Sequence, residues 1–127
     1  MARRRSIHID GFTHSNPLPN ACRIGNLVMS SVIVGRDPGA RTVSPSLEQQ
    51  CANMFDYVKA TVEAAGGTTD DIIKMTFWMK DRSQRDVLNV AWAKMFPDAE
   101  NRPARHSVQT ELDGGVLIQC DFTAVIG

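Results

Sequence analysis

The longest hydrophobic pattern in the chain lies between residues 46 and 65 and has the spacing of a helix. Its apolar positions recur every three or four residues: Leu47, Cys51, Met54, Phe55, Val58, Val62 and Ala65. Ser46 precedes the pattern with Gln49 three residues later, as in a capping box, and Gly66-Gly67 supplies a C-terminal stop. The sequence therefore predicts an amphipathic helix whose Met and Phe side chains belong to the core.

A second, shorter helical pattern starts near Ser83. Its apolar face consists of five residues: Val87, Leu88, Ala91, Trp92 and Met95. Ser83 and Asp86 have the spacing of a helix start, and Pro97 cannot continue the helix. We therefore expect a second amphipathic helix between these positions.

Alternation of apolar and polar residues predicts the strands. Residues 72–80 alternate, and one parity is apolar: Ile73, Met75, Phe77 and Met79. This is the pattern of a half-buried strand. Residues 21–24 and 27–34 flank Gly25-Asn26, a pair suited to a type II′ hairpin turn, and a short first strand is expected within residues 6–10.

The last quarter of the chain predicts two more strands. Pro103 fixes its own φ and disfavours the α region for the residue before it, so an extended segment is expected after it. Side chains then alternate, which places Arg105, Ser107 and Gln109 on one face. A turn at Asp113-Gly114-Gly115 leads to a final strand with an inward-facing set: Val116, Ile118, Cys120, Phe122 and Ala124.

The order of these elements predicts an α+β fold, with both helices packed on one face of a mixed six-stranded sheet. The connection from strand 72–80 through the second helix to strand 104–111 is long enough for a right-handed parallel crossover. At 127 residues the chain fits a single domain, residues 1–127, with one core.

Charge and cysteine content narrow the classes of partner. Lys+Arg and Asp+Glu are both 14, so there is no basic field to attract nucleic acid, and nucleic-acid binding is not expected. Cys22, Cys51 and Cys120 are odd in number, far apart and without a CxxC pair, which disfavours a disulfide framework and a zinc site. We expect no cofactor and no metal.

The start of the chain and its hydropathy bear on localisation. Residues 1–6 are basic, but no apolar run of about 7–15 residues follows, so a signal peptide is not expected. No stretch approaches the ~20 consecutive apolar residues of a membrane helix. The sequence predicts a cytoplasmic protein with reduced thiols and no membrane partner.

Arg105 is the first candidate for ligand binding. A guanidinium anchored on a strand is a rigid, permanently charged fork that suits a carboxylate. The alternative is an arginine that extends to solvent or pairs with a nearby acid, and only a position in a cleft would distinguish the ligand-binding role from this one.

Two other residues are candidates for proton transfer. His14, in a polar loop, could titrate as an acid or base or be merely solvated. Asp121 shares the parity of Gln119 and could supply a carboxylate or form a structural ion pair.

A series of short motifs occurs along nearly the whole chain in a characteristic order: Asn16-Pro17-Leu18-Pro19, Ile24-Gly25-Asn26-Leu27, Gly35-Arg36-Asp37-Pro38, Glu48-Gln49-Gln50, Val62-Glu63-Ala64-Ala65-Gly66-Gly67, Lys80-Asp81 with Arg85, Phe96-Pro97-Asp98, Arg102-Pro103-Ala104-Arg105 and Ile118-Gln119-Cys120-Asp121. Their order and spacing together resemble the Rid family of reactive intermediate deaminases, also known as the YjgF family.

The resemblance implies a fold similar to that of chorismate mutase, assembled as a homotrimer with ligand sites in the clefts between subunits. It implies hydrolysis of enamine or imine acids, such as 2-aminoacrylate or 2-aminomuconate, to keto acids and ammonia. Arg105 stands at the carboxylate-binding arginine of the family, and Ser31 and Val32 stand in a segment that would also bind substrate. Asn89 matches a polar position near the cleft. With Gln119 and His14 it completes the candidate catalytic residues.

Two departures from the family pattern bear on the chemistry. Gln119 occupies the position of a glutamate thought to orient or activate water, and an amide can hold water but cannot accept its proton at neutral pH. Val32 replaces a usual glycine and could narrow the pocket. A non-catalytic, carboxylate-binding trimer that retains Arg105 is therefore the alternative to a deaminase. An endoribonuclease is a third possibility, against which the balanced charge argues.

Overall fold

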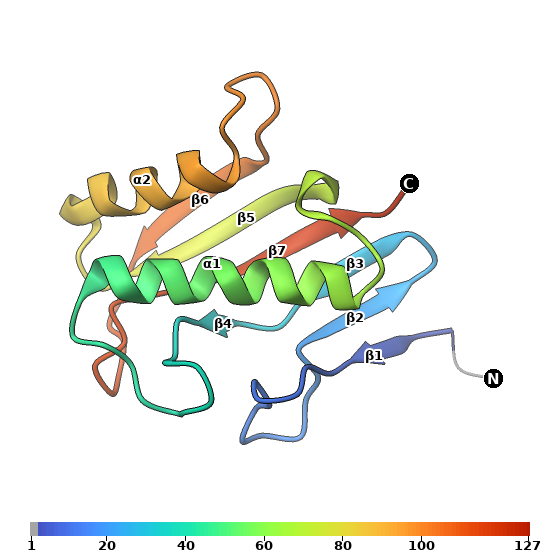
Figure 1. Cartoon of the computed structure of the whole chain (residues 1–127), viewed down its shortest axis with the longest axis horizontal. Helices are drawn as coiled ribbons and strands as arrows, with labels where there is room; N and C mark the ends of the chain where they lie inside the picture. Colours follow the sequence, from blue (N-terminus) through green and yellow to red (C-terminus); the bar gives the residue numbers. More distant parts are fainter. Residues whose placement is uncertain (1–2) are drawn as a thin grey trace.

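The computed structural model describes residues 3–127, so the basic start of the chain lies only partly within the described residues (Figure 1). The strands are β1 (Arg5–Ile7), β2 (Ala21–Ile24), β3 (Leu27–Ser30), β4 (Ile33–Val34), β5 (Ile72–Met79), β6 (Ala104–Gln109) and β7 (Ile118–Val125). The helices are α1 (Leu47–Ala64) and α2 (Arg85–Met95), and each of the short 3₁₀ turns η1 (Thr69–Asp71) and η2 (Arg82–Gln84) precedes the element that follows it.

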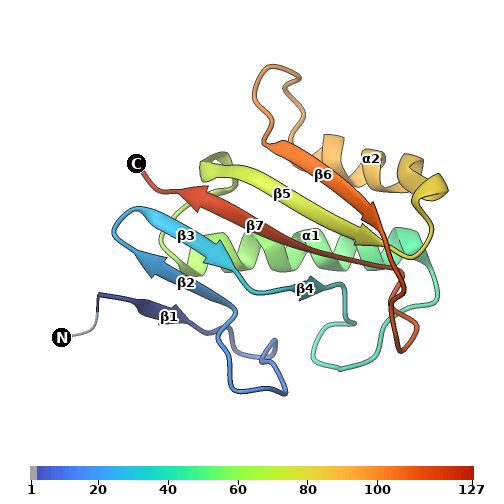
Figure 2. The same ribbon diagram turned by 180° about the vertical axis from the view of Figure 1, so that it is seen from behind.

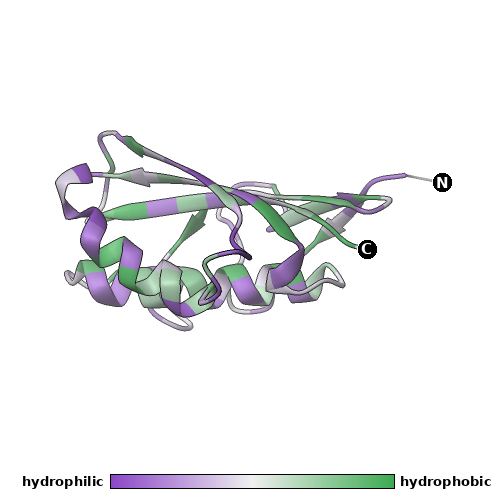
Figure 3. Ribbon diagram, turned by 90° about the horizontal axis from the view of Figure 1, so that it is seen from above, coloured by the Kyte–Doolittle hydropathy of each residue, from purple (hydrophilic) through white to green (hydrophobic). Residues whose placement is uncertain are grey.

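All strands belong to one sheet, in the order β1-β2-β3-β7-β5-β6, with β4 also paired to β7. Neighbouring strands are antiparallel except β5 and β6, which are parallel and joined by the predicted crossover through α2. Both helices cover the same face of the sheet, as the two opposite views show (Figures 1 and 2). Seen edge-on, the other face carries no helix in the described part of the chain (Figure 3). The predicted α+β class is confirmed.

The sheet has seven strands rather than the expected six, because the predicted strand 27–34 is interrupted. Both of its parts, β3 and β4, still pair with β7. Between them, the Ser31 N–H donates to the Asn20 carbonyl at 2.9 Å and the Ser31 hydroxyl donates to the Pro19 carbonyl at 2.7 Å. Hydrogen bonds to the preceding loop thus replace the ladder at the interruption.

The start of β5 departs from the predicted alternation. A register shift against β7 between Ile72 and Lys74 is the mark of a β-bulge, which reverses the side-chain parity locally. As a result Ile72 is buried, whereas Ile73, predicted to face inward, is 57% exposed. Beyond the bulge, Met75 and Phe77 face the core as expected.

The two helices begin in different ways. The Ser46 hydroxyl accepts the Gln49 N–H at 3.2 Å, as predicted, but the reciprocal half of a capping box is replaced by a 2.9 Å bond from the Gln49 amide to Asn53. Ser83, placed at the predicted start of the second helix, does not cap α2, which has no side-chain cap. Asp81, not Ser83, accepts the first hydrogen bond, from the Ser83 N–H at 2.9 Å, and the η2 turn leads into α2.

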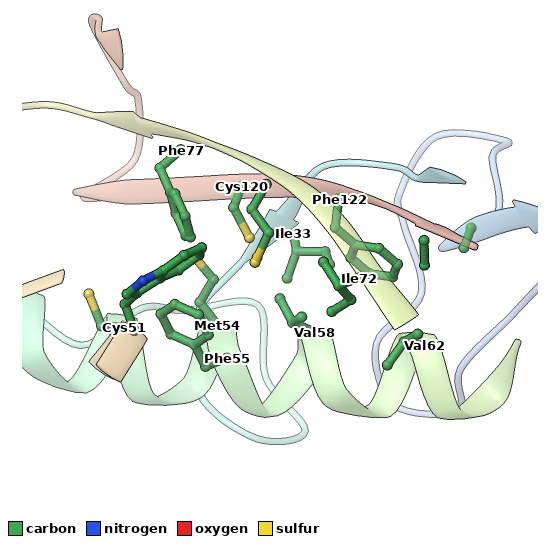
Figure 4. Packing of buried hydrophobic residues seen from close by; sticks show 14 of the residues in the cluster. Ile33, Cys51, Met54, Phe55, Val58, Val62, Ile72, Phe77, Cys120 and Phe122 are labelled. Atoms are coloured by element: carbon green, nitrogen blue, oxygen red, sulfur yellow. The ribbon is translucent and has the colours of Figure 1, made fainter. Parts of the chain in front are cut away.

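The core lies between the sheet and the helices (Figure 4). The Phe77 ring packs against two other aromatic rings of the core. Its centroid lies 5.8 Å from that of Phe55 and 5.9 Å from that of Trp92. Burial raises the pKa of the Cys51 thiol to about 11 and that of the Cys120 thiol well above its ordinary range. Both cysteines are therefore protonated at neutral pH and act as small apolar core residues.

Gln50 is a fully buried polar side chain that ties α1 to the segment before β7. Its Nε2 donates to the carbonyls of Ser44 at 2.7 Å and Gly115 at 3.0 Å, and its Oε1 accepts the Leu117 N–H at 2.9 Å. Gly35 packs so close to the Gln50 backbone that a Cβ at position 35 would overlap the Gln50 carbonyl. One side chain thus satisfies three backbone groups of irregular segments.

We expect Gln50→Leu to lower the free energy of unfolding by about 3 kcal/mol, because the volume is nearly kept while three backbone groups lose their partner. Chemical denaturation followed by circular dichroism measures this. Gln84→Leu, at an exposed position before α2, is the matched control and should change the free energy by less than about 0.5 kcal/mol. Equal effects of the two substitutions would contradict the role of Gln50.

Candidate functional site

Arg105 lies on the face of β6 that is turned toward the helices. It pairs in register with buried Met75 of β5, and Ser107 pairs with buried Phe77. This confirms the predicted parity, in which Arg105, Ser107 and Gln109 share one face. The face is covered by α2, since the crossover from β5 to β6 lays this helix over the strand it leads into.

The Arg105 guanidinium is held by an amide and two aromatic rings. Its Nη2 donates to Asn89 Oδ1 at 2.7 Å, and its Cζ lies 5.2 Å from the Trp92 ring centroid and 5.9 Å from that of Phe77. Such contacts orient the planar fork and stabilise its charge through the ring faces. The structure therefore brings together two of the predicted site residues, Arg105 on β6 and Asn89 on α2.

No carboxylate within residues 3–127 neutralises Arg105. Burial lowers the pKa of Arg105, and the positive charge of Arg85 lowers it further, yet an arginine remains protonated at neutral pH. A guanidinium offers five N–H donors, of which Asn89 engages one. The group is thus a charged, oriented donor with capacity for an anionic ligand.

Two hollows of the described chain lie away from Arg105. One, of about 260 Å³, lies beside η1 and the residues before β6. The other, of about 900 Å³, is the groove between α1 and α2. Arg105 lines neither of them.

Gln119 is separated from Arg105 by the sheet itself. Its cross-strand partners are Trp78 and Val34, and buried Ile118 and Cys120 flank it, so Gln119 faces away from the helices. Asp121 shares this open face, and burial raises the pKa of its carboxyl. One chain therefore does not bring the predicted catalytic amide to the predicted binding arginine.

The open face also carries an apolar patch. Register places Ile24 beside Leu27 and Leu27 beside Val125, with Met29 on the same side of β3. Their exposed fractions are 39%, 47%, 47% and 56%, in the order Ile24, Leu27, Val125 and Met29. Contiguous exposed apolar side chains of this kind mark interaction surfaces.

The remaining predicted site residues are His14, Ser31 and Val32. His14 follows β1, and Ser31 and Val32 follow β3, and both of these strands lie away from β6 in the order of the sheet. Ser31 bonds to the loop before β2, as described above, and Val32 is 37% exposed beside it. Burial, with the charges of Arg36 and Arg41, lowers the pKa of His14. His14 is therefore a neutral imidazole at pH 7, and its Nε2 has no hydrogen-bond partner among the described residues. None of the three meets Arg105 within the chain.

The structure adds residues to the site that the sequence analysis assigned elsewhere or did not single out. Trp92 and Phe77 were predicted as core, but both also present ring faces to Arg105. Ser107 has a buried hydroxyl with no partner among the described residues. Arg85 lies four residues before Asn89, one turn earlier on the same side of α2. The helical spacing of Arg85, Asn89 and Trp92 was the available signal.

No group of three or more His, Cys, Asp or Glu side chains is placed to hold a metal ion among residues 3–127. No helix in this part of the chain is long and apolar enough to span a membrane.

Comparison with known proteins identifies relatives across nearly the whole chain. The family model described as Endoribonuclease L-PSP matches residues 10–126. A RutC family protein of Pyrococcus horikoshii is 30% identical over 120 residues, which cover 89% of this chain and 94% of that protein. A 2-iminobutanoate/2-iminopropanoate deaminase of Salmonella typhimurium is 30% identical over 111 residues, covering 86% and 87%.

Comparison with solved structures points to the same family as the sequence relatives. The crystal structure of RidA from an Antarctic Psychrobacter species superposes with a TM-score of 0.88 at 28% identity, covering 96% of this chain and 99% of that one. The order of motifs, the two-helix mixed sheet and the matching family model together lead to one conclusion. The chain belongs to the Rid family, which also goes by the names YjgF and RutC.

Proposed function

We propose that this protein hydrolyses 2-imino acids, or the enamines in equilibrium with them, to 2-keto acids and ammonia. The observation that carries the proposal is the Arg105 guanidinium, which is oriented by Asn89 and Trp92 and neutralised by no carboxylate in the described chain. The relatives named as deaminases of 2-iminobutanoate and 2-iminopropanoate support it, since both substrates carry a carboxylate beside a C=N bond.

The reaction needs little beyond positioning and proton transfer. Arg105 would bind the carboxylate through two parallel hydrogen bonds, which fixes the adjacent imine carbon. Water adds to that carbon and gives a carbinolamine. Transfer of a proton to nitrogen then allows ammonia to leave, and the carbonyl of the keto acid forms. Substrate and water thus account for all atoms of the products.

We further propose that the active assembly is a homotrimer whose sites lie between subunits. Arg105 and Gln119 lie on opposite faces of one sheet, so they can share a site only when they come from different copies. The apolar patch of Ile24, Leu27, Met29 and Val125 offers the surface for that contact. The edge of β6 and the open face of a neighbouring sheet would then supply the walls of the site.

Gln119 is the feature that favours the second candidate function, a carboxylate-binding trimer without turnover. Its amide orients water by hydrogen bonds but takes up no proton.

In the deaminase, another residue has to accept that proton. Asp121 lies two residues from Gln119 on the same open face, and a carboxyl with a raised pKa suits a general base better than an ordinary surface aspartate. We propose Asp121 as the proton acceptor in the deaminase.

The ribonuclease activity in the family description finds no support in the balanced charge of this chain.

Arg105→Ala should reduce kcat/KM for 2-imino acids by about a hundredfold, because the charged clamp on the carboxylate is lost. The measurement is ammonia or keto-acid release from imines generated in the assay. Arg82→Ala, an exposed arginine at the start of η2, is the control and should leave the rate unchanged. Keto-acid binding that depends on Arg105, without turnover in the wild type, would instead establish the binding trimer.

Met29→Asp should convert the trimer to smaller species, because three charges would be placed in a desolvated contact. Sedimentation velocity measures the change in mass. Val90→Asp introduces the same charge at a 72% exposed apolar position on α2 and should leave the mass unaltered. A wild-type protein that sediments as a monomer would refute the shared site.

Gln119→Glu should raise kcat about tenfold or more, because a carboxylate can take up the proton that an amide cannot. Steady-state kinetics across pH 6 to 9 would show the gain, with KM nearly constant. Gln109→Glu, which lies on the opposite face of the sheet, serves as a charge-matched control. A lower kcat in Gln119→Glu than in the wild type would exclude water activation at this position.

A further inference from the structure

The polar residues between α2 and β6 form a cluster larger than the clamp around Arg105. Helix and strand run in opposite directions here. The Arg82 N–H at the start of η2 donates to Gln109 Oε1 at 2.9 Å, while Asn89, two turns further on, accepts from Arg105. Arg85 lies between these two contacts along the helix, and Ser107 lies between them along the strand.

Arg85 lies on the side of α2 that is turned toward this cluster. Residues 85, 89 and 92 follow the spacing that puts side chains on one helical face. Asn89 and Trp92 of that face both contact the Arg105 guanidinium. The charge of Arg85 also contributes to lowering the pKa of Arg105, as expected for two nearby cations. The cluster therefore holds two positive charges.

The acidic neighbour of Arg85 belongs to a different surface. Asp86 lines the groove between α1 and α2, one residue around the helix from the cluster. No carboxylate among the described residues bonds to Arg85 or Arg105. The charges of Arg85 and Arg105 repel each other, and an anion with two negative groups relieves that repulsion.

Ser107 provides an observation of a different kind. Its hydroxyl is buried on the same face as Arg105 and has no hydrogen-bond partner in the described residues. Buried hydroxyl groups are nearly always paired, so an unpaired one on the same face as the Arg105 guanidinium points to a bound group that completes it. A hydroxyl both donates and accepts, which suits an imine, a carbonyl or a carboxylate oxygen.

We propose that the site takes a 2-imino acid with a second, distal carboxylate, in which Arg105 binds the carboxylate beside the C=N bond and Arg85 binds the distal one. Arg85 lies one helical turn, a rise of about 5.4 Å, from Asn89, the residue that holds the Arg105 guanidinium, and the carboxylates of a five- or six-carbon diacid are separated by a similar length. The Ser107 hydroxyl, two residues from Arg105 on the same face of β6, would contact the substrate beside the first carboxylate. The inference rests on the proposed function for its reaction and concerns only which acids are selected.

Stable 2-keto acids test this selection without turnover. The probes are 2-oxoglutarate, which has two carboxylates, and 2-oxobutanoate, which has one, each titrated into the full-length protein by isothermal titration calorimetry. We expect the wild type to bind 2-oxoglutarate at least tenfold more tightly. In Arg85→Gln this ratio should fall toward one, because one charge-assisted contact to the distal carboxylate is worth about tenfold in affinity or more.

Arg82→Gln is the matched control, since it removes one positive charge a single turn away from the proposed contact. It should keep the wild-type ratio, and circular dichroism would verify that both variants are folded. Equal affinity of the wild type for the two acids, or an unchanged ratio in Arg85→Gln, overturns the inference. Absence of imine turnover together with an Arg85-dependent ratio would overturn the hydrolase and leave the diacid selectivity established.

Discussion

The arrangement of the molecule depends on the packing of α2 over β6, which surrounds one guanidinium with an amide and two rings. The parallel pairing of β5 and β6 requires a crossover, and the crossover places α2 on the face where Arg105 projects. Trp92 then serves the core and the site together, because its ring packs against Phe77 and Phe96 while lying near Arg105. The site is thus built into the core rather than added to a loop.

A rigid support of this kind has a functional reason. A long arginine side chain loses much conformational freedom when it binds a ligand, and orientation by neighbours before binding reduces that loss. The Asn89 bond at 2.7 Å and the two ring faces supply the orientation without neutralising the charge. A carboxylate partner would have oriented Arg105 equally well but would have competed with an acidic substrate.

Much of the fold, and the face on which Arg105 lies, could be predicted from the sequence because both follow from short-range periodicity. The α1 stripe, the face shared by Arg105 and Ser107, and the crossover all depend on spacing within one or two elements. What could not be predicted depends on contacts between distant segments. The bulge that exposes Ile73 is a matter of register with β7, and the interruption at Ser31 depends on hydrogen bonds to the loop before β2. Neither leaves a local pattern.

The separation of Arg105 from Gln119 has the same origin and carries the largest consequence. Both lie at odd positions of strands, but β7 and β6 are on opposite sides of β5 and run in opposite directions, so equal parity in number does not mean an equal face. The family motifs assign the two residues to one site, whereas in the structure they lie on opposite faces of the sheet. If they act together, assembly and catalysis cannot be separated: a change that weakens the apolar open face removes the water-holding amide from every bound carboxylate, even where Arg105 itself is untouched.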